Sequence, residues 1–405
     1  MTDICLYFQV HQPFRLAKYT IFDIGKHSRY FDETKNKEIM LKVARKCYLP
    51  ANSTIRHLIS KHDDFKVAYS ISGTALEQFE KYAPNVLRSF RELSGTGAVE
   101  FLSETSHHSL SSLANADEFT QQIREHQKMI KKTFGQKPKV FRNTELIYNN
   151  EIAKKAEQLG FKAILAEGWD SILGWRSPNH VYQPAGTRKI RLLLKNYRLS
   201  DDIAFRFSNK NWNGWPLTAE KFAGWAAPIL GDTTNLFMDY ETFGEHQWED
   251  TGIFNFLKHL PSALKQHGIS FHHPSELSKI QPKEKLDIPH TISWADTERD
   301  TTAWLGNKMQ QSAHALIYQM RREVLSSGDS EIIASWKKLT TSDHFYYMCT
   351  KWFNDGDVHK YFSPYDTPYD CYINYMNILQ DMALRLKNKK GLFASIKKFV
   401  KEVKI

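Results

Sequence analysis

The chain has 405 residues, which is long enough for one large domain or for a large domain with an appendage. Its composition is 41% hydrophobic and 25% charged, with 19 glycines and 14 prolines, which is ordinary for a globular protein and excludes collagen-like and low-complexity chains. Two values stand out, the formal net charge of +10 and the aromatic content of 13%. The first suggests a nucleic-acid partner, and the second suggests stacking on a flat ligand.

Three features of the sequence predict the compartment. No stretch approaches 18 apolar residues, so we expect no transmembrane helix and no integral membrane segment. The first residues lack a basic start and are polar by Gln9, unlike a signal peptide. The four cysteines lie far apart without a CxxC pair, which argues against a zinc ribbon or a redox motif. We therefore expect a reduced, cytoplasmic protein.

Short apolar runs alternate with helical patterns through the first two thirds of the chain. Such runs are typical of parallel strands that are buried on both faces. We expect strands at residues 4–10, 65–71, 98–102, 139–141, 163–166, 190–194, 235–238 and 269–271, with helices between them such as 118–134 and 150–160. Seven or eight βα units predict an α/β fold with a closed or nearly closed β/α barrel.

The pattern changes after about Pro274, where strand-like runs stop. Helices are expected at residues 303–325, 330–338 and 372–389. We therefore predict a barrel catalytic domain over residues 1–275 and a carboxy-terminal helical domain over residues 276–405 that contributes to the active site. Residues 176–233 interleave Gly, Pro, Asn and Trp, and we expect them to form long loops over one barrel face.

Polar clusters follow three of the expected strands, at the strand ends where barrel enzymes carry their functional groups. They are His11-Gln12-Pro13, Arg142-Asn143-Thr144-Glu145 and Asp239-Tyr240-Glu241-Thr242-Phe243-Gly244. Glu145 and Asp239 are expected to converge over one barrel mouth, although each alone also fits a helix N-cap or a solvated loop charge. Paired carboxylates suit glycoside hydrolysis, in which one attacks the anomeric carbon while the other protonates the leaving oxygen and then activates water.

Five segments, taken in order, resemble sequence regions of glycoside hydrolase family 57, the retaining enzymes that act on α-glucans. They are His11-Gln12-Pro13, Gly97-Ala98-Val99-Glu100-Phe101, the run from Phe141 to Leu146, the run from Phe237 to Gly244, and the run from Asp300 to Asn307. The chain is most similar to the shorter, α-amylase-like members. The resemblance implies an incomplete (β/α)7 barrel followed by a helical region. Ala98 and the segment Glu245-His246-Gln247-Trp248 depart from the common pattern, which leaves substrate length and product preference open.

The resemblance also implies roles for individual residues. Glu145 looks like the catalytic nucleophile and Asp239 like the general acid/base. Residues expected to bind substrate, from the resemblance or from their place after a strand, are His11, Gln12, Glu100, His108, Arg142, Trp169, Glu241, Asp300 and Trp304. Trp294 and Asp296 lie close enough in sequence to be the true counterparts of Trp304 and Asp300.

Two neighbouring charges fit the roles of the carboxylates. Arg142 is expected to keep Glu145 ionised, although it equally suits a structural charge at the barrel rim. Glu241 is expected to disfavour ionisation of Asp239, because residues i and i+2 of a continuing strand point the same way.

The tryptophans are unevenly placed, with eight of the ten between Trp169 and Trp304. Flat indole faces pack on the apolar faces of sugar rings, although several of these side chains suit core or loop anchors equally well.

His107 and His108 follow the third strand and raise the question of a metal site. The chain has neither the HxxxH pair of the polysaccharide deacetylases, a related barrel type, nor an HExxH motif. We therefore expect no metal and no other cofactor, and treat both histidines as rim residues.

The last 25 residues carry eight Lys or Arg and two acids, a net charge of +6 out of +10. Their apolar residues recur at helical spacing, which predicts a docked amphipathic helix or, alternatively, a weak anchor to an anionic surface. Because the charge is concentrated in this tail, we expect no nucleic-acid partner.

The leading interpretation is a retaining hydrolase of α-1,4 links in α-glucan oligo- or polysaccharides. The alternatives are a 4-α-glucanotransferase or branching enzyme that uses the same site, a non-catalytic glucan-binding protein, and a metal-dependent deacetylase. The sequence leaves the oligomeric state open.

Overall fold

The computed structural model describes residues 2–351 and 363–403, and for residues 389–403 it describes the helical backbone alone. The chain forms two compact units, each assembled from separate segments. The barrel unit comprises Met1–Gln12, Lys37–Ser106 and Thr120–Ala295, and the helical unit comprises Pro13–Asn36, His107–Phe119 and Asp296–Ile405. The domain boundary expected between residues 275 and 276 stays a prediction.

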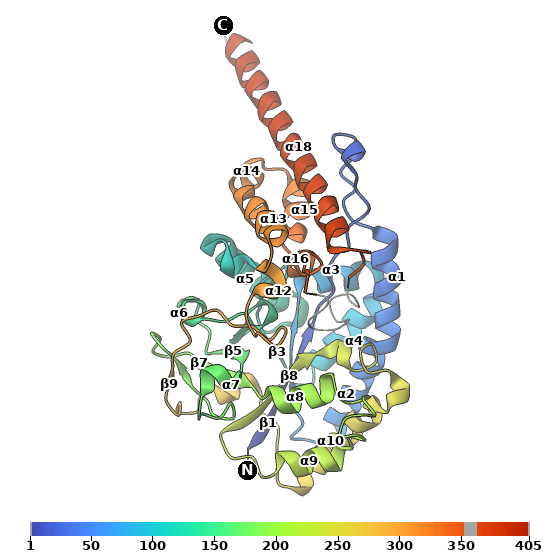
Figure 1. The fold of residues 1–405 in the computed structure, drawn as a ribbon, viewed down its shortest axis with the longest axis vertical. Helices are drawn as coiled ribbons and strands as arrows, with labels where there is room; N and C mark the ends of the chain where they lie inside the picture. The colour runs from blue at the N-terminus through green and yellow to red at the C-terminus, as the bar shows by residue number, and fades with distance from the viewer. Residues whose placement is uncertain (1, 352–362, 404–405) are drawn as a thin grey trace. The chain divides into compact units, whose positions relative to one another are not determined.

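Seven parallel strands form the centre of the barrel unit (Figure 1). Four of them pair in the order β3-β2-β1-β8 and three in the order β4-β5-β7. Their bounds are Asp3–Val10 (β1), Val67–Ile71 (β2), Val99–Phe101 (β3), Val140–Arg142 (β4), Ala163–Glu167 (β5), Arg191–Lys195 (β7) and Thr233–Asp239 (β8). Seven of the eight predicted strands are thus confirmed. The eighth, at residues 269–271, makes only a parallel bridge from Phe271 to Ile4.

Backbone contacts connect the two sheets at both edges. Beside β3, the Ser103 N–H donates to Val140 O at 3.0 Å, and the Arg142 N–H donates to Ser103 O at 2.9 Å. Beside β8, the Asn196 N–H donates to Asn235 O at 2.8 Å. The result is an incomplete seven-stranded barrel, as expected, in which all the carboxyl ends of the strands face one mouth.

The strands are buried on both faces, which explains their nearly continuous apolar sequences. Small and aromatic side chains fill the barrel interior, among them Cys5, Tyr7, Ala68 and Phe237. The outer faces pack against helices that include Leu49–Lys61 (α2), Gly73–Tyr82 (α3), Pro84–Ser94 (α4) and Ile253–Gln266 (α10).

Residues 176–233 are more regular than expected. They contain two helices, Tyr197–Ala204 (α8) and Ala219–Ala226 (α9), and the short strand Gln183–Pro184 (β6). Asn196 and Thr218 cap the two helices, because their side chains accept hydrogen bonds from Leu199 N and Lys221 N. The strand β6 pairs with Lys285–Leu286 (β9), so strands do not stop at Pro274 as expected.

The helical unit contains the expected carboxy-terminal helices, with one difference. The single helix expected at residues 303–325 is divided into Thr302–Leu305 (α12), Lys308–Gln319 (α13) and Arg321–Ser326 (α14). Asn307 begins α13 through a capping box with Gln310, which interrupts the helix after Gly306. The other helices are Ser330–Leu339 (α15), Ser342–Tyr346 (α16) and Pro368–Val403 (α18).

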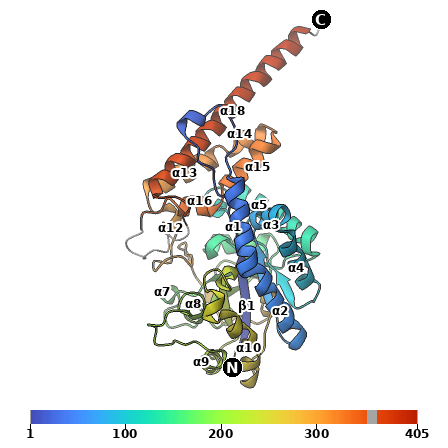
Figure 2. The ribbon, with the colours of Figure 1, turned by 90° about the vertical axis from the view of Figure 1, so that its right-hand side faces the viewer.

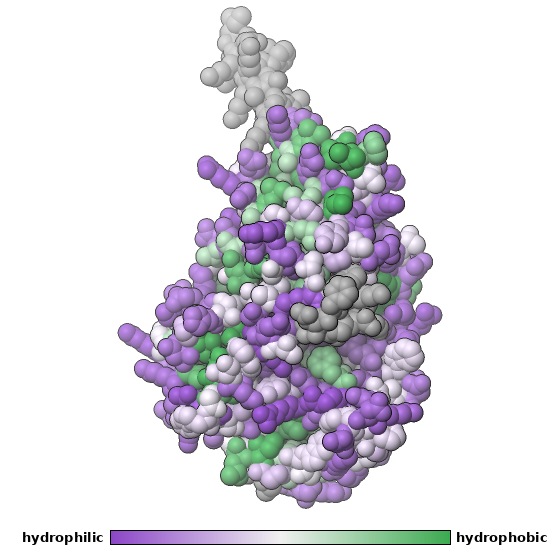
Figure 3. All heavy atoms as spheres, viewed as in Figure 1, coloured by the Kyte–Doolittle hydropathy of each residue, from purple (hydrophilic) through white to green (hydrophobic). Residues whose placement is uncertain are grey.

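Figure 2 shows α18 running beside α13. Early residues of the chain also pack on it, since the Tyr19 N–H donates to Asn374 Oδ1 at 2.6 Å. The side chains of the basic tail from residue 389 onward lie outside the described residues, so its docking or anchoring stays a prediction. Within the part of the chain that the structure describes, no helix is long and apolar enough to cross a membrane. On the face shown in Figure 3, the hydrophobic residues form separate patches, with hydrophilic side chains between them.

Candidate active site

Polar and charged side chains gather at the carboxyl ends of the strands, where the chain leaves the barrel. Arg142 ends β4, Glu167 ends β5, Lys195 ends β7 and Asp239 ends β8. The strand register places Glu167 beside Lys195 on one side of the mouth and Asp239 beside Gln9 on the other. The mouth is therefore the place where widely separated segments of the sequence bring charges together.

Glu145 follows β4 in a short 3₁₀ turn, Thr144–Leu146. Its backbone is left-handed, with φ 57° and ψ 26°, and Leu146 also has a positive φ of 50°. Two consecutive non-glycine residues in this region cost conformational energy, and strained residues of this kind cluster at functional sites. The Glu145 side chain in this turn is partly exposed.

A second segment runs antiparallel to the chain around Glu145. Tyr148 and Ile292 exchange both backbone hydrogen bonds, each at 2.9 Å. Farther along, the Trp294 backbone N–H donates to Glu145 O at 3.2 Å, and its indole Nε1–H donates to Glu145 Oε2 at 2.7 Å. Trp294, one of the two tryptophans that the sequence left as alternatives, thus contacts the expected nucleophile.

Asp239 and Glu241 do not share a strand, contrary to our expectation. The strand β8 ends at Asp239, and Glu241 lies in the following 3₁₀ turn, Tyr240–Thr242. Glu241 is buried and accepts a hydrogen bond from the Tyr48 hydroxyl. Burial, and then the negative charge of Asp239, raise the pKa of Glu241 to about 8. The negative charge of Asp239 thus acts on Glu241, which carries a proton at neutral pH. The expected effect of Glu241 on the ionisation of Asp239 stays a prediction.

This coupling predicts a pH-dependent stability. Because folding raises the pKa of Glu241 from 4.5 to about 8, its contribution is complete below pH 4.5 and is lost as the pH rises through 8. At about 1.36 kcal/mol per pKa unit, the free energy of unfolding should fall between pH 5 and pH 8 by roughly 3 kcal/mol more in the wild type than in Glu241→Gln. Urea unfolding of both proteins across this range measures the difference, and parallel pH dependences would contradict it.

His11 and Gln12 lie where the sequence placed them, just after β1. His11 Nδ1 is 2.7 Å from Ser72 Oγ, and Gln12 Nε2 donates to the Tyr48 hydroxyl at 3.3 Å. Gln12 therefore connects through Tyr48 to Glu241, which joins the first and fourth sequence regions in one hydrogen-bond network.

Arg142 is fully buried, and its guanidinium lies 4.8 Å from the centre of the Trp294 ring. Among the residues that the structure describes, none is a hydrogen-bond partner of its three guanidinium nitrogens, so Arg142 does not bond to Glu145 directly. A buried guanidinium with unmet donors is costly unless a ligand supplies acceptors. Its placement keeps it among the candidate substrate-binding residues.

Lys195 was not predicted. It is 3% exposed, its Nζ is 2.9 Å from Asp201 Oδ1 and 3.7 Å from Glu167 Oε2, and it lies 5.4 Å from the centre of the Trp294 ring. Glu167 and Lys195 could have been found by the rule that barrel enzymes carry functional groups at the carboxyl ends of their strands, since each directly follows an expected strand. Trp294 has no such local signal.

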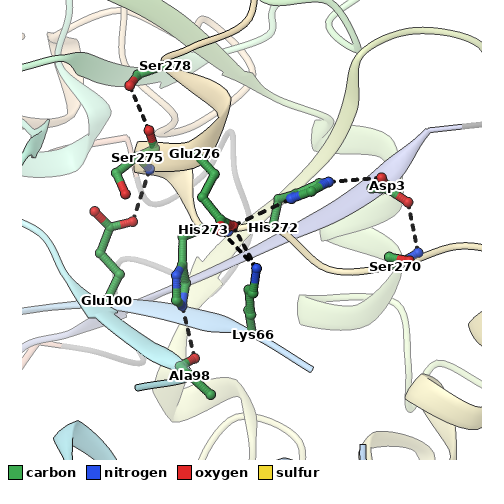
Figure 4. Close-up of polar contacts among 10 residues, drawn as sticks. All are labelled: Asp3, Lys66, Ala98, Glu100, Ser270, His272, His273, Ser275, Glu276 and Ser278. Atoms are coloured by element: carbon green, nitrogen blue, oxygen red, sulfur yellow. Dashed lines mark hydrogen bonds and ion pairs between the residues drawn. The ribbon is translucent and has the colours of Figure 1, made fainter. Parts of the chain in front are cut away.

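Glu100 is separated from the mouth. It lies in β3 opposite Ala68, and its Oε2 accepts a hydrogen bond from Ser275 N at 3.0 Å. Figure 4 shows Glu100 bonded to Ser275, among polar contacts that also include Lys66, which precedes β2, and Asp3, which begins β1. The structure thus places Glu100 toward the amino-terminal ends of the strands, opposite to Glu145 and Asp239. Burial raises the pKa of its carboxyl group.

Trp169, expected to touch sugar, directly precedes the short helix Asp170–Leu173 (α7) after β5 and is partly exposed. In the helical unit, Asp300 Oδ1 accepts a hydrogen bond at 2.8 Å from the N–H of Thr302, the first residue of α12. Trp304 is 1% exposed and packs against Tyr346. His108 is buried and accepts a hydrogen bond from Ser342 N through its carbonyl oxygen. Substrate contacts of these residues stay predictions.

Within residues 2–351 and 363–403, no group of three or more His, Cys, Asp or Glu side chains is arranged to hold a metal ion. The expectation that the reaction needs no metal or other cofactor stays a prediction. Activity measured with and without EDTA would test the metal part of it.

Comparison with known proteins identifies the class to which this barrel and its mouth belong. Residues 5–289 match the family model described as "Glycosyl hydrolase family 57". The chain belongs to this family, and it is therefore a glycosidase with the family's incomplete barrel.

The relatives include a curated protein of Methanocaldococcus jannaschii named "Putative alpha-amylase". It is 48% identical over 398 residues, which cover 94% of this chain and 84% of the relative. Among solved structures, the GH57-type branching enzyme of Pyrococcus horikoshii matches with a TM-score of 0.68 at 15% identity, over 94% of this chain and 88% of that one. The α-amylase AmyC of Thermotoga maritima matches with a TM-score of 0.61 at 12% identity, over 98% and 94%. These two structures are similar in fold.

Proposed function

We propose that this protein is a retaining α-glucan hydrolase that cleaves α-1,4-glucosidic bonds through a covalent glycosyl-enzyme intermediate. The observation that carries the proposal is the geometry of Glu145. This glutamate lies at the barrel mouth in a left-handed backbone conformation, and its carboxylate accepts a hydrogen bond from the Trp294 indole N–H. The name of the relative from Methanocaldococcus jannaschii supports an α-amylase type of activity.

In the first step, the Glu145 carboxylate attacks the anomeric carbon while Asp239 protonates the departing glycosidic oxygen. A carboxylate that accepts an N–H hydrogen bond is stabilised in its ionised form, as a nucleophile requires. In the second step, Asp239 removes a proton from water, and the water displaces Glu145 with net retention of configuration. This mechanism requires the two carboxyl groups to approach within about 5–5.5 Å with substrate bound.

The neighbours of the two carboxylates would bind the sugar. Arg142 offers guanidinium N–H groups without acceptors, and a pyranose hydroxyl supplies such an acceptor. Glu241 is protonated below about pH 8, so below that pH it adds no second negative charge beside Asp239. His11, Gln12 and Trp169 complete the substrate contacts that we propose within the barrel unit. Asp300, Trp304 and His108 are further substrate-binding residues that we propose from the sequence alone.

The alternative is a 4-α-glucanotransferase or branching enzyme, because the same intermediate is transferred to a sugar in place of water. The structural likeness to a branching enzyme keeps this alternative open. The physiological substrate in either case would be a glycogen-, starch- or dextrin-like α-glucan in the cytoplasm.

Incubation with maltoheptaose separates these functions. A hydrolase should release only shorter sugars, a transferase should also form sugars longer than the substrate, and a non-catalytic protein should leave maltoheptaose unchanged. We expect shorter sugars, at the same rate with and without EDTA. Dependence on a divalent metal would contradict the cofactor-free mechanism.

A further inference from the structure

We propose that Trp294 is a positioning residue that holds the nucleophile Glu145 ionised and correctly oriented, and that the cations Arg142 and Lys195 fix its indole ring for this purpose. The inference rests on the proposed function only in calling Glu145 the nucleophile. The geometry that carries it lies entirely within the barrel unit.

Trp294 contacts Glu145 at two points. Its backbone N–H donates to the Glu145 carbonyl oxygen at 3.2 Å, and its indole N–H donates to the carboxylate Oε2 at 2.7 Å. The backbone contact holds the left-handed turn in place, and the side-chain contact fixes the rotation of the carboxylate.

The indole is itself held by charge. The Arg142 guanidinium lies 4.8 Å from the ring centre and the Lys195 ammonium 5.4 Å, both within the range of cation–π attraction. Arg142 is fully buried, and among the described residues its three nitrogens have no hydrogen-bond partner, so its contact with the Trp294 ring gives favourable surroundings to its charge. Two cations over one indole draw electron density from it and make its N–H a stronger donor.

Lys195 is fixed in turn by the end of a neighbouring strand. Its ammonium is 2.9 Å from Asp201 Oδ1 and 3.7 Å from Glu167 Oε2. The chain of contacts from Glu167 and Asp201 through Lys195 and Trp294 therefore ends at Glu145. Other charged groups at the strand ends of the mouth are Arg142 and Asp239.

Trp294→Phe keeps the ring and removes the N–H donor. We expect kcat on maltoheptaose to fall roughly 100-fold with little change in KM, because the nucleophile loses its orientation while the sugar contacts remain. The acidic limb of the pH profile of kcat/KM should move up by about one unit, since the ionised form of Glu145 loses a charge-assisted hydrogen bond. Trp294→His retains a ring N–H and should recover part of the loss.

Trp336→Phe is the matched control. Trp336 is fully buried, and its indole N–H donates to Ile317 O at 2.8 Å within the helical unit. This variant loses the same kind of bond and should keep the wild-type kcat and pH profile. If Trp294→Phe behaves like Trp336→Phe in both measurements while Glu145→Gln is inactive, the positioning role is refuted and the proposed function stands.

A spectroscopic measurement tests the contact without any activity. The chain has ten tryptophans, so ¹⁵N-labelled indole groups give few enough signals to follow with pH. We expect the Trp294 signal, identified by its loss in Trp294→Phe, to titrate in the wild type and to stop titrating in Glu145→Gln. A signal that is unchanged by pH in the wild type would overturn the inference, even if the protein proves inactive on glucans.

Discussion

Glu145→Gln should lower kcat on maltoheptaose by at least roughly 10⁴-fold, because an amide at the same position accepts the Trp294 hydrogen bond but cannot displace the leaving sugar. The fold should be unchanged, since the side chain is partly exposed and close to isosteric. Initial rates of sugar release measure the effect. Glu151→Gln, a change of an exposed glutamate on the helix Asn150–Gln158 (α6), is the matched control and should keep wild-type activity.

Azide distinguishes the two carboxylates. In Glu145→Ala, azide that enters the vacated space should attack the sugar directly and give a β-glycosyl azide. In Asp239→Ala, azide should attack the glycosyl-enzyme and give an α-glycosyl azide. The opposite pair of products would exchange the two roles, and a Glu145→Gln variant that keeps a tenth of the wild-type activity would remove Glu145 from the mechanism.

Lys195→Met should lower the free energy of unfolding by about 3–5 kcal/mol, because it leaves two carboxylates in the barrel mouth without their cation. Lys195 is 3% exposed, and its partners Glu167 and Asp201 are 0% and 9% exposed. Urea unfolding at pH 7 measures the loss. The triple variant Lys195→Met, Glu167→Gln, Asp201→Asn should recover most of the lost free energy of unfolding, since all three charges of this cluster are then removed together. A loss below about 1 kcal/mol in the single variant would show that this cluster is solvated like a surface pair.

The barrel could be predicted because its strands are buried on both faces and therefore read as continuous apolar runs. The weakest prediction concerned residues 269–271, where a short apolar run forms one bridge to Ile4 instead of a strand. The irregular composition of residues 176–233 obscured two helices whose caps, Asn196 and Thr218, are single polar residues in a polar stretch. The helix expected at 303–325 is interrupted by Asn307, which competes locally for the backbone.

The candidate site was predictable as far as strand ends define it. That rule placed Glu145, Asp239, His11 and Gln12 around the mouth, and it extends to Lys195. The strand-end rule does not point to Trp294, because Trp294 does not follow a strand. It is 149 residues from Glu145 in sequence and contacts it through an antiparallel pairing of two segments, which no local sequence pattern predicts.

Glu100 is the opposite case. It sits within a three-residue strand, so the sequence cannot tell toward which end of the barrel its side chain extends. In the structure, the Glu100 carboxylate accepts a hydrogen bond from Ser275 N, toward the amino-terminal ends of the strands.

The most direct test of the covalent mechanism is mass spectrometry of Asp239→Asn incubated with α-maltotriosyl fluoride. Fluoride leaves without protonation, so the first step proceeds, while the loss of the base slows hydrolysis of the intermediate. We predict that a maltotriosyl ester accumulates and that peptide analysis places it on Glu145. A sugar ester on any other residue, or fluoride release at the wild-type rate without a covalent adduct, would contradict the assignment of Glu145 as the nucleophile.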